Sequence, residues 1–271
     1  MLSPLCQRWR DRRGSYRPAG EVIRPSEFDV CLLPDDARAK AFVCAHHYSG
    51  SYPAARARVG LYRRGELAGG LGASQPVHAG VLACLPGTDA SAKAELGRFV
   101  LRDDVGGNGE TWMLARAFTL LRAEGIETLV SFADPFPRTR LDGSRAFAGH
   151  LGTIYQASNA SFRGRARGGT IYLLPDGTIF PRRAIQKIRA EGRERGWDYA
   201  ARALVAFGAA PLTRPELGRA WLATWLPRLT RQARHPGNWR YLFGLDRRAR
   251  RHLPESLPYP KLEARQLELT L

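Results

Sequence analysis

Residues 95–135 decide the fold and read ELGRFVLRDDVGGNGETWMLARAFTLLRAEGIETLVSFADP. Leu96–Leu101 and Thr128–Ala133 are short apolar runs, which predicts two buried strands. Between them, the apolar residues of Glu110–Ala123 recur at helical spacing, and Gly125 is placed to end that helix. The stretch therefore predicts a strand, a glycine-rich turn, a helix and a second strand.

The turn between the first strand and the helix contains three glycines and can bind an anion. Gly106, Gly107 and Gly109 can adopt positive φ angles without a Cβ clash. Because the first N–H groups of a helix have no partner within the helix, such a turn can bind a pyrophosphate. A tight strand–helix connection without a ligand is the alternative. Neither G-x-G-x-x-G nor Gly-Lys-Ser/Thr is present, which excludes the Rossmann and P-loop motifs.

The net charge of +17 is concentrated in the last third of the 271 residues. Residues 182–271 carry 19 basic and 8 acidic side chains, residues 27–181 carry 17 and 15, and residues 1–26 carry 6 and 2. This distribution predicts a basic N-terminal arm (1–26), a nearly neutral domain (27–181) and a basic helical C-terminal extension (182–271). Nucleic acid is the commonest partner for such a pattern, through contacts to phosphates.

The sequence also bears on location. No apolar run reaches the roughly 18 residues of a membrane span, and the basic N-terminus lacks the apolar stretch of a signal peptide. Cys6, Cys31, Cys44 and Cys84 show neither C-x-x-C pairs nor zinc-site spacing. We therefore expect a cytoplasmic protein with reduced cysteines and no membrane partner.

The other predicted elements surround the central stretch, and from Pro181 onward we expect helices. The elements are a strand at 28–33, a helix from 34 to about 44, a hairpin of strands at 58–62 and 67–74, a helix within 148–163, and a hairpin of strands at 170–174 and 178–180. This order predicts an α/β (α+β layered) fold with a mixed, mostly antiparallel sheet flanked by helices.

That order, with an anion-binding turn between the fourth strand and its helix, resembles the GNAT acyltransferase superfamily, in which this turn holds the pyrophosphate of acetyl-CoA. Four patches narrow the resemblance to the Mom family of phage and mobile-element DNA modification proteins, which are divergent GNAT enzymes. The patches are HHYS at 46–49, GRF at 97–99 with NGETW at 108–112, SFADP at 131–135, and GHLGTIYQASN at 149–159. The resemblance covers roughly residues 28–180.

The resemblance implies an enzyme that alters the N6 amine of adenine in double-stranded DNA and thereby protects phage or mobile-element DNA from restriction. It implies an acetyl-CoA-type donor and a methylcarbamoyl or related acyl product. The donor-binding candidates are Arg98, Arg102, Gly106, Gly107, Asn108, Gly109, Glu110, Thr111, Ser158 and Asn159. Arg98 and Arg102 could contact donor phosphates or DNA, or form a solvated pair at the strand ends.

His47, Tyr48 and Asp134 are predicted to surround the acceptor amine. An imidazole can act as a general base near neutral pH, and a phenol can donate a proton. Asp134 follows a strand, where open α/β sheets place their ligand groups. Both positions can reach the opening where the fourth and fifth strands diverge. A surface histidine pair and a strand-ending Asp-Pro turn are the alternatives.

The same three side chains could hold a divalent metal such as iron. Tyr155 lies where GNAT enzymes keep a residue that protonates the departing thiolate, and Asn159 is on the same predicted helix face. Packing in the core is the alternative for Tyr155. Ser131 is the further candidate if His47 and Asp134 are not catalytic.

Cations and aromatic residues are interleaved near the C-terminus, which suits phosphate contacts and stacking on an extruded base. A solvated helical face, with its aromatic residues anchored in the core, is the alternative. The nucleic-acid-binding candidates are Arg234, Asn238, Trp239, Arg240, Arg247, Arg248, Arg250 and Arg251.

The sequence thus leads to one main hypothesis and two alternatives. The main hypothesis is an acyltransferase-like enzyme that flips an adenine out of DNA, because N6 cannot be reached inside the stack. The first alternative is an acetyltransferase acting on a protein, an RNA or a small amine. The second is a DNA-binding protein on a degenerate GNAT fold without catalysis.

Overall fold

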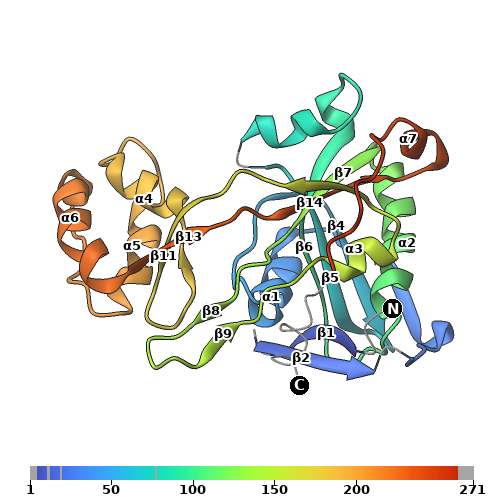
Figure 1. Ribbon diagram of the computed structural model, residues 1–271, viewed down its shortest axis with the longest axis horizontal. Coiled ribbons are helices and arrows are strands. Elements are labelled where there is room, and N and C mark those ends of the chain that lie inside the picture. The colour runs from blue at the N-terminus through green and yellow to red at the C-terminus, as the bar shows by residue number, and fades with distance from the viewer. Residues whose placement is uncertain (1–4, 11–12, 19, 77, 262–271) are drawn as a thin grey trace. The chain divides into compact units, whose positions relative to one another are not determined.

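The computed structural model describes residues 5–10, 13–18, 20–76 and 78–261. Packing divides the chain into two compact units (Figure 1). Unit 1 lies within residues 1–135, 150–166 and 238–271. Unit 2 comprises residues 136–149 and 167–237 and is therefore inserted twice into the chain of unit 1.

Unit 1 is built on a seven-stranded sheet with the order β10-β14-β7-β6-β5-β4-β3. All neighbouring strands are antiparallel except β6 and β7, which are parallel. This confirms the predicted mixed, mostly antiparallel sheet. The strands are β3 (Phe28–Leu32), β4 (Ala55–Arg63), β5 (Glu66–Ser74), β6 (Lys93–Leu101), β7 (Thr128–Ala133), β10 (Ser161–Arg165) and β14 (Trp239–Gly244).

Strands β6 and β7 pair only at their beginnings. Their register runs from Lys93 opposite Thr128 to Glu95 opposite Val130, and both strands continue beyond that point. The register between β5 and β6 also shifts around Gly97, so that β6 bulges there. The two strands therefore diverge, as predicted for the fourth and fifth strands.

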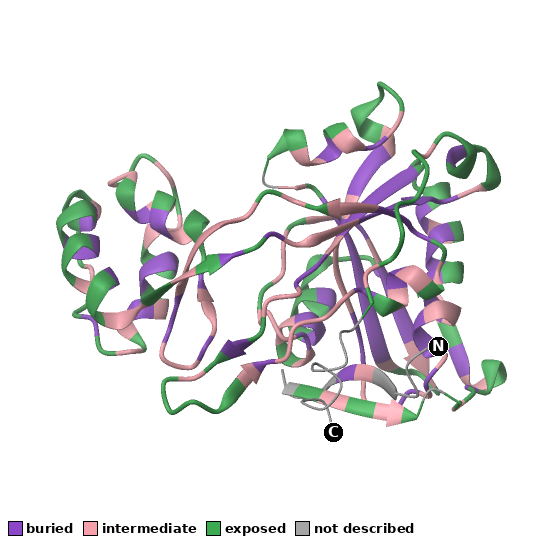
Figure 2. Ribbon diagram, viewed as in Figure 1, coloured by how far each residue is buried: buried purple, intermediate pink, exposed green. Residues whose placement is uncertain are grey.

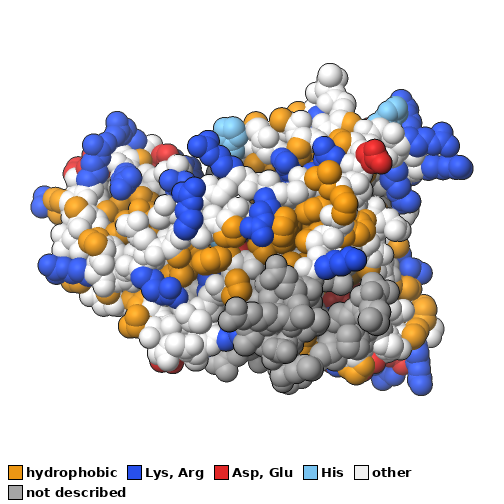
Figure 3. All heavy atoms as spheres, viewed as in Figure 1, with side chains coloured by type: hydrophobic (Ala, Val, Ile, Leu, Met, Phe, Trp, Pro, Cys, Tyr) orange, Lys and Arg blue, Asp and Glu red, His pale blue; other side chains and the backbone are white. Residues whose placement is uncertain are grey.

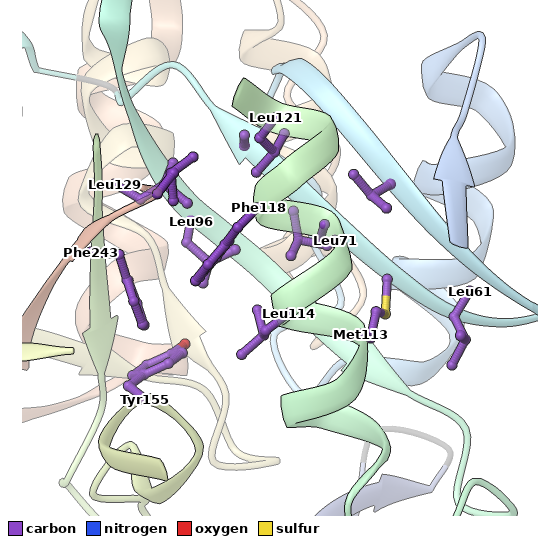
Figure 4. Packing of buried hydrophobic residues seen from close by; sticks show 14 of the residues in the cluster. Leu61, Leu71, Leu96, Met113, Leu114, Phe118, Leu121, Leu129, Tyr155 and Phe243 are labelled. Atoms are coloured by element: carbon purple, nitrogen blue, oxygen red, sulfur yellow. The ribbon is translucent and has the colours of Figure 1, made fainter. Parts of the chain in front are cut away.

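Helices cover both faces of this sheet. Two consecutive β6 residues show this, because successive side chains of a strand point to opposite faces. Leu101 packs in the cluster that contains α2 (Gly109–Ala123), whereas Val100 packs against Phe42 of α1 (Asp36–His46). Figure 4 shows Leu114, Phe118 and Leu121 of α2 facing the strands. Strands β5 and β7 are almost wholly buried (Figure 2).

Two predictions of helix are confirmed only in part. The helix expected within 148–163 is the short α3 (Thr153–Ala157), limited by Gly152 before it and Asn159 after it, which both have positive φ angles. The extension expected from 182 onward contains helices only as far as Leu229 and then gives way to β13 (Arg231–His235) and β14. The apolar β14 sequence pairs with both β7 and β10, which satisfies its backbone in the middle of the sheet. Within the residues that the structure describes, only the short α7 (Arg247–Arg251) follows β14.

The N-terminal segment of unit 1 forms a hairpin of β1 (Leu5–Arg10) and β2 (Arg13–Pro18). Short 3-10 turns complete this unit at Pro25–Glu27, Ala79–Cys84 and Ala90–Ala92. Leu82 and Leu85 pack on Val130 and Leu242, and so cover part of the sheet.

Unit 2 has its own core and is strongly basic. Its strands are β8 (Arg138–Thr139), β9 (Arg145–Phe147), β11 (Gly169–Leu173), β12 (Ile179–Phe180) and β13. Its helices are α4 (Arg182–Arg189), α5 (Trp197–Val205) and α6 (Gly218–Leu229). A 3-10 turn at Pro215–Leu217 leads into α6. Leu204, Ile188 and Leu222 bring the three helices together. The unit carries 16 basic and 6 acidic side chains, a net charge of +10.

Candidate active site

Polar side chains gather in unit 1 at the divergence of β6 and β7. The His47 and Tyr48 rings lie 4.3 Å apart directly after α1, and the Tyr48 ring meets the His150 ring edge-on at 5.9 Å. The backbone N–H of His150 donates to the carbonyl of Asp134 at 2.7 Å. The structure thus brings together residues that are about 100 positions apart in the sequence.

His47 is buried, and its backbone contact favours one tautomer. Its Nδ1 accepts a hydrogen bond from the backbone N–H of Ser49 at 3.1 Å and lies 2.9 Å from the Ser49 hydroxyl. Burial lowers the pKa of His47 well below its usual value, and the nearby Arg98 and His150 lower it further. His47 is therefore neutral at pH 7, with its proton on Nε2, which makes that atom a hydrogen-bond donor.

Arg98 links the loop after α1 to the bulge in β6. Its Nε donates to the carbonyl of Ser51 and its Nη2 donates to the Ser51 hydroxyl, both at 2.8 Å. Tyr48, Glu95 and Tyr155 are close enough to interact electrostatically with the guanidinium. Arg98 therefore lies in the centre of the group rather than at a solvated strand end.

Tyr155 and Ser131 are on the β7 side of the divergence. The Ser131 hydroxyl donates to the carbonyl of Leu96 at 3.2 Å, across the gap between the strands. A side-chain hydrogen bond joins Ser131 to Tyr155, and burial raises the pKa of the Tyr155 hydroxyl. Figure 4 shows this tyrosine beside Phe243, with its ring in the core. Tyr155 is thus both a core residue and a neighbour of the polar group.

Glu95 belongs to the same group and was missed by sequence reasoning. It occupies the last paired position of β6 before the divergence. Burial raises the pKa of its carboxyl above the usual value, and Arg98 opposes that shift. A lone glutamate in the otherwise apolar run before the Gly97 bulge was the available signal. We call this group the divergence cluster: His47, Tyr48, Glu95, Arg98, Ser131, Asp134, His150 and Tyr155.

The β6–α2 turn (residues 102–109) contains the predicted pyrophosphate-binding glycines. Gly106 and Gly109 do not use the positive φ angles that glycine permits. Close packing explains these two glycines instead. A Cβ on Gly109 would lie 2.5 Å from Val105, and one on Gly106 would lie 3.2 Å from Ile23.

The polar groups of the β6–α2 turn are engaged within the chain. Arg102 pairs with Asp104 and Glu66 at 2.6 and 3.3 Å. Glu110 pairs with the buried Arg8. The Asn108 side chain accepts from the N–H of Ile23 at 2.8 Å, and the Thr111 hydroxyl donates to the Asn108 carbonyl at 3.0 Å.

Comparison with known proteins identifies the family. The sequence model of the Mom protein family matches residues 30–261, most of the chain. This chain belongs to the Mom protein family. A search of the curated proteins finds no match.

Among solved structures, this Mom family chain is similar to a tandem GNAT protein from the clavulanic acid biosynthesis pathway, solved without AcCoA. The identity is 12% and the TM-score is 0.35. The match covers 72% of this chain and 66% of that protein, slightly less than two thirds of its length. Among the described residues, no helix is both long and apolar enough to cross a membrane.

The predicted iron site of this Mom family chain finds no support in the structure. In the tautomer in which Nδ1 of His47 accepts from the backbone N–H of Ser49, Nε2 carries the proton and offers no lone pair to a metal. Within the described ranges, no group of three or more His, Cys, Asp or Glu side chains could hold a metal ion. We therefore assign no role to iron.

Ser158 and Asn159 lie beyond the end of α3 rather than within a helix. Asn159 has a φ angle of 58° and ends the helical turn, so it does not share a helix face with Tyr155 as predicted. The physical reason is the positive φ itself, which reverses the backbone direction.

The predicted nucleic-acid-binding residues do not form one group. Arg247, Arg248, Arg250 and Arg251 are exposed on α7, which follows Gly244. Gly244 pairs with Thr128 at the start of β7, whereas Asp134 follows the end of β7. Thr128 and Asp134 are separated by the length of β7, about 20 Å, so α7 lies near the opposite end of the sheet from Asp134.

Trp239 and Arg240 are on β14 at the Asp134 end of the sheet. The Trp239 ring packs edge-on against Phe162 at 5.5 Å, and the Arg165 guanidinium lies 4.1 Å above it. This packing favours the alternative that Trp239 anchors the segment in the core. The Asn238 carbonyl accepts from the N–H of Ala166 at 2.8 Å. Arg234 is exposed on β13 of unit 2.

Proposed function

We propose that this chain transfers an acyl-type group from an acyl-CoA-type donor to the N6 amine of adenine in double-stranded DNA. The observation that carries the proposal is the divergence cluster, which groups a neutral imidazole, carboxylates, a guanidinium and a buried phenol. Adenine N6 is a poor nucleophile because its lone pair is delocalised into the ring. Its reaction therefore requires a base beside the amine and a stabilised electrophile. Membership of the Mom family supports DNA modification as the reaction's setting.

We assign proton acceptance to the carboxylates. Glu95 is the stronger candidate, since burial raises its pKa and hence its basicity, and Asp134 is the second. As the N6–carbon bond forms and the carbon–sulfur bond of a thioester breaks, the N6 proton passes to the carboxylate. The departing thiolate takes a proton from the Tyr155 hydroxyl.

His47 is assigned a different role from the general base expected from sequence. Its Nε2–H is a donor held in place by the Ser49 contacts to Nδ1. Such a donor can stabilise negative charge on the acyl oxygen as the bond to N6 forms. Arg98, fixed by Ser51, adds a positive charge to the same region.

The donor would supply an electrophilic carbonyl carbon, and the β6–α2 turn is assigned to its pyrophosphate. One observation supports this fit: the backbone N–H of Gly107 already donates to a carboxylate, that of Glu21. An anion is therefore compatible with this position at the start of α2.

Unit 2 and α7 are assigned to DNA, because phosphate neutralisation by basic side chains provides most non-specific affinity. Figure 3 shows Lys and Arg side chains spread over the face in view, with few acidic ones among them. The adenine would have to leave the stack to meet the divergence cluster.

Mass spectrometry of nucleosides tests the proposal. DNA from cells that express the wild type should contain an adenine nucleoside of increased mass. Asp134→Asn should reduce its amount by about a hundred- to ten-thousand-fold, as for the loss of a proton acceptor. His47→Ala should reduce it by about a hundred- to a thousand-fold, as for the loss of an oxyanion donor. Neither variant should change the melting temperature much. Asp29→Asn, an exposed change of the same kind on β3, is the matched control. Acylated protein or RNA with unmodified DNA would favour the acetyltransferase alternative. DNA affinity without any mass change would favour the binding protein.

A further inference from the structure

The N-terminal hairpin of unit 1 lies on the β6–α2 turn. The Arg8 guanidinium donates to the Gly106 carbonyl at 2.9 Å, and Arg17 Nη1 donates to the Asp103 carbonyl at 2.6 Å. The Ser15 hydroxyl donates to the Asp103 carboxylate at 2.7 Å. Both strands of the hairpin therefore contact the turn through side chains that donate hydrogen bonds.

The residues after the hairpin also contact the turn, through the backbone and side chain of Glu21. The N–H of Asn108 donates to the Glu21 carbonyl at 3.2 Å, and the N–H of Gly107 donates to the Glu21 carboxylate. Arg17 Nε and Nη2 each donate to one oxygen of that carboxylate at 2.7 Å. The Glu21 carboxylate thus has a backbone N–H and a two-pronged arginine as partners, which is the set of partners that a phosphate group prefers.

We propose that Glu21 is an internal competitor of the donor's diphosphate, and that Arg17 changes partner from Glu21 to that diphosphate when the donor binds. The proposal rests on the proposed function, because it takes the β6–α2 turn as the donor site. It adds Arg17 to the donor-binding residues. It also makes the N-terminal hairpin a device that restricts donor binding.

The exchange requires only a side-chain rotation. The Glu21 side chain is 33% exposed and that of Arg17 is 26% exposed, so both reach solvent. Ile23 is buried against the core two residues later and holds the backbone in place. Glu21 can therefore turn outward while its carbonyl keeps the bond to Asn108.

The geometry also explains why the diphosphate would win at sufficient concentration. A diphosphate carries more negative charge than one carboxylate and offers more acceptor oxygens, so it gains more from the same guanidinium and N–H donors. Conversely, the Glu21 carboxylate is tethered beside the turn, so its contact costs side-chain entropy but no translational freedom. At low donor concentration the internal partner therefore stays bound.

Calorimetry with coenzyme A and the full chain tests this proposal without DNA. Glu21→Gln should raise the affinity for coenzyme A about tenfold, because the competing charge is removed. Arg17→Gln should lower it by a similar factor, and Arg17→Lys should restore only part of the loss, since lysine cannot form the fork. Glu124→Gln, at the other end of α2, is the matched control and should change nothing. Melting temperatures show whether each variant is folded.

Pantetheine, which lacks the diphosphate, separates this mechanism from a general effect on the site. Its affinity should be the same for the wild type and Glu21→Gln. An unchanged or reduced coenzyme A affinity in Glu21→Gln would overturn the proposal, and so would coenzyme A binding to neither protein. If the affinities change as expected but no modified adenine is ever found, the competitor role stands and the assignment of adenine as acceptor fails.

Discussion

His47 Nδ1 accepts the backbone N–H of Ser49 at 3.1 Å, which places the imidazole proton on Nε2. This relationship separates two roles that sequence reasoning could not distinguish. A histidine whose Nδ1 is bound in this way presents a donor to the site, not a base. The proton acceptor must then be another group, and the carboxylates of the divergence cluster are available.

The first prediction concerns this donor role. His47→Ala should lower DNA modification by about a hundred- to a thousand-fold, as for the loss of one oxyanion donor. His47→Gln should retain part of the activity, because its amide nitrogen can donate where Nε2 does. Quantitative mass spectrometry of adenine nucleosides measures both. His46→Gln changes the adjacent residue, whose ring packs on Phe42, and should stay active. Equal loss in His47→Gln and His47→Ala would contradict the donor role.

The second prediction follows from the lowered pKa of His47. Between about pH 6.5 and its folded pKa, the unfolded chain binds a proton at this histidine and the folded chain does not. Stability should therefore fall as pH falls through this window, by up to about 1.4 kcal/mol per pH unit from this group. His47→Gln should show a shallower dependence. Urea unfolding of the wild type and of His47→Gln at pH 7.0 and 5.5 measures the two pH dependences. An equal loss of stability in the two proteins would mean that the imidazole of His47 also protonates in the folded state.

Much of unit 1 could be predicted from the sequence because its elements have strong local signals. The run at 96–101, the helix at 110–123 and the Asp35-Asp36 start of α1 all carry periodicity or capping residues. Asp35 indeed caps α1 by accepting from Ala37 and Arg38.

The parts that were missed depend on long-range pairing. Residues 239–244 contain the sequence WRYLFG, which is also compatible with a helix, and only the neighbouring β7 and β10 make it a strand. The Glu21 contact to the β6–α2 turn joins positions more than 80 residues apart, and no local pattern encodes it. Glu95 was overlooked because a single carboxylate in an apolar run acquires meaning only once the bulge at Gly97 is known.

The third prediction identifies the base. Glu95→Gln should lower the modification rate by about a hundred- to ten-thousand-fold. In the wild type the rate should fall as pH falls through the raised pKa of Glu95, because the protonated carboxyl cannot accept the N6 proton. Single-turnover assays on duplex DNA across pH 4.5–8 measure this fall in rate. Full activity of Glu95→Gln would leave Asp134 as the acceptor.

The fourth prediction concerns the buried phenol. Tyr155→Phe keeps the ring packing against Tyr241 and Phe243, so the free energy of unfolding should change by only about 1 kcal/mol for the missing hydrogen bond. The modification rate should nevertheless fall markedly, because the thiolate loses its proton donor. Ser131→Ala is the companion variant, since it removes the hydroxyl partner and leaves the phenol. Unimpaired catalysis by Tyr155→Phe would restrict Tyr155 to the core.

The last prediction divides DNA affinity between α7 and unit 2. The slope of log affinity against log salt should become shallower when Arg247, Arg248, Arg250 and Arg251 are neutralised. The slope should change by at most about 0.9 for each phosphate that these arginines neutralise in the wild type. Neutralising four exposed arginines of unit 2, at 189, 193, 214 and 228, should make the slope shallower in the same way if this unit also binds the phosphate backbone.

Because α7 lies a strand length from Asp134, the α7 variant should bind DNA less tightly yet modify bound DNA at the normal rate. Filter binding over a salt series and single-turnover modification at saturating DNA separate the two effects. An α7 variant with an unchanged slope would show that these arginines form only a solvated face, and a slower single turnover would place DNA across both ends of the sheet.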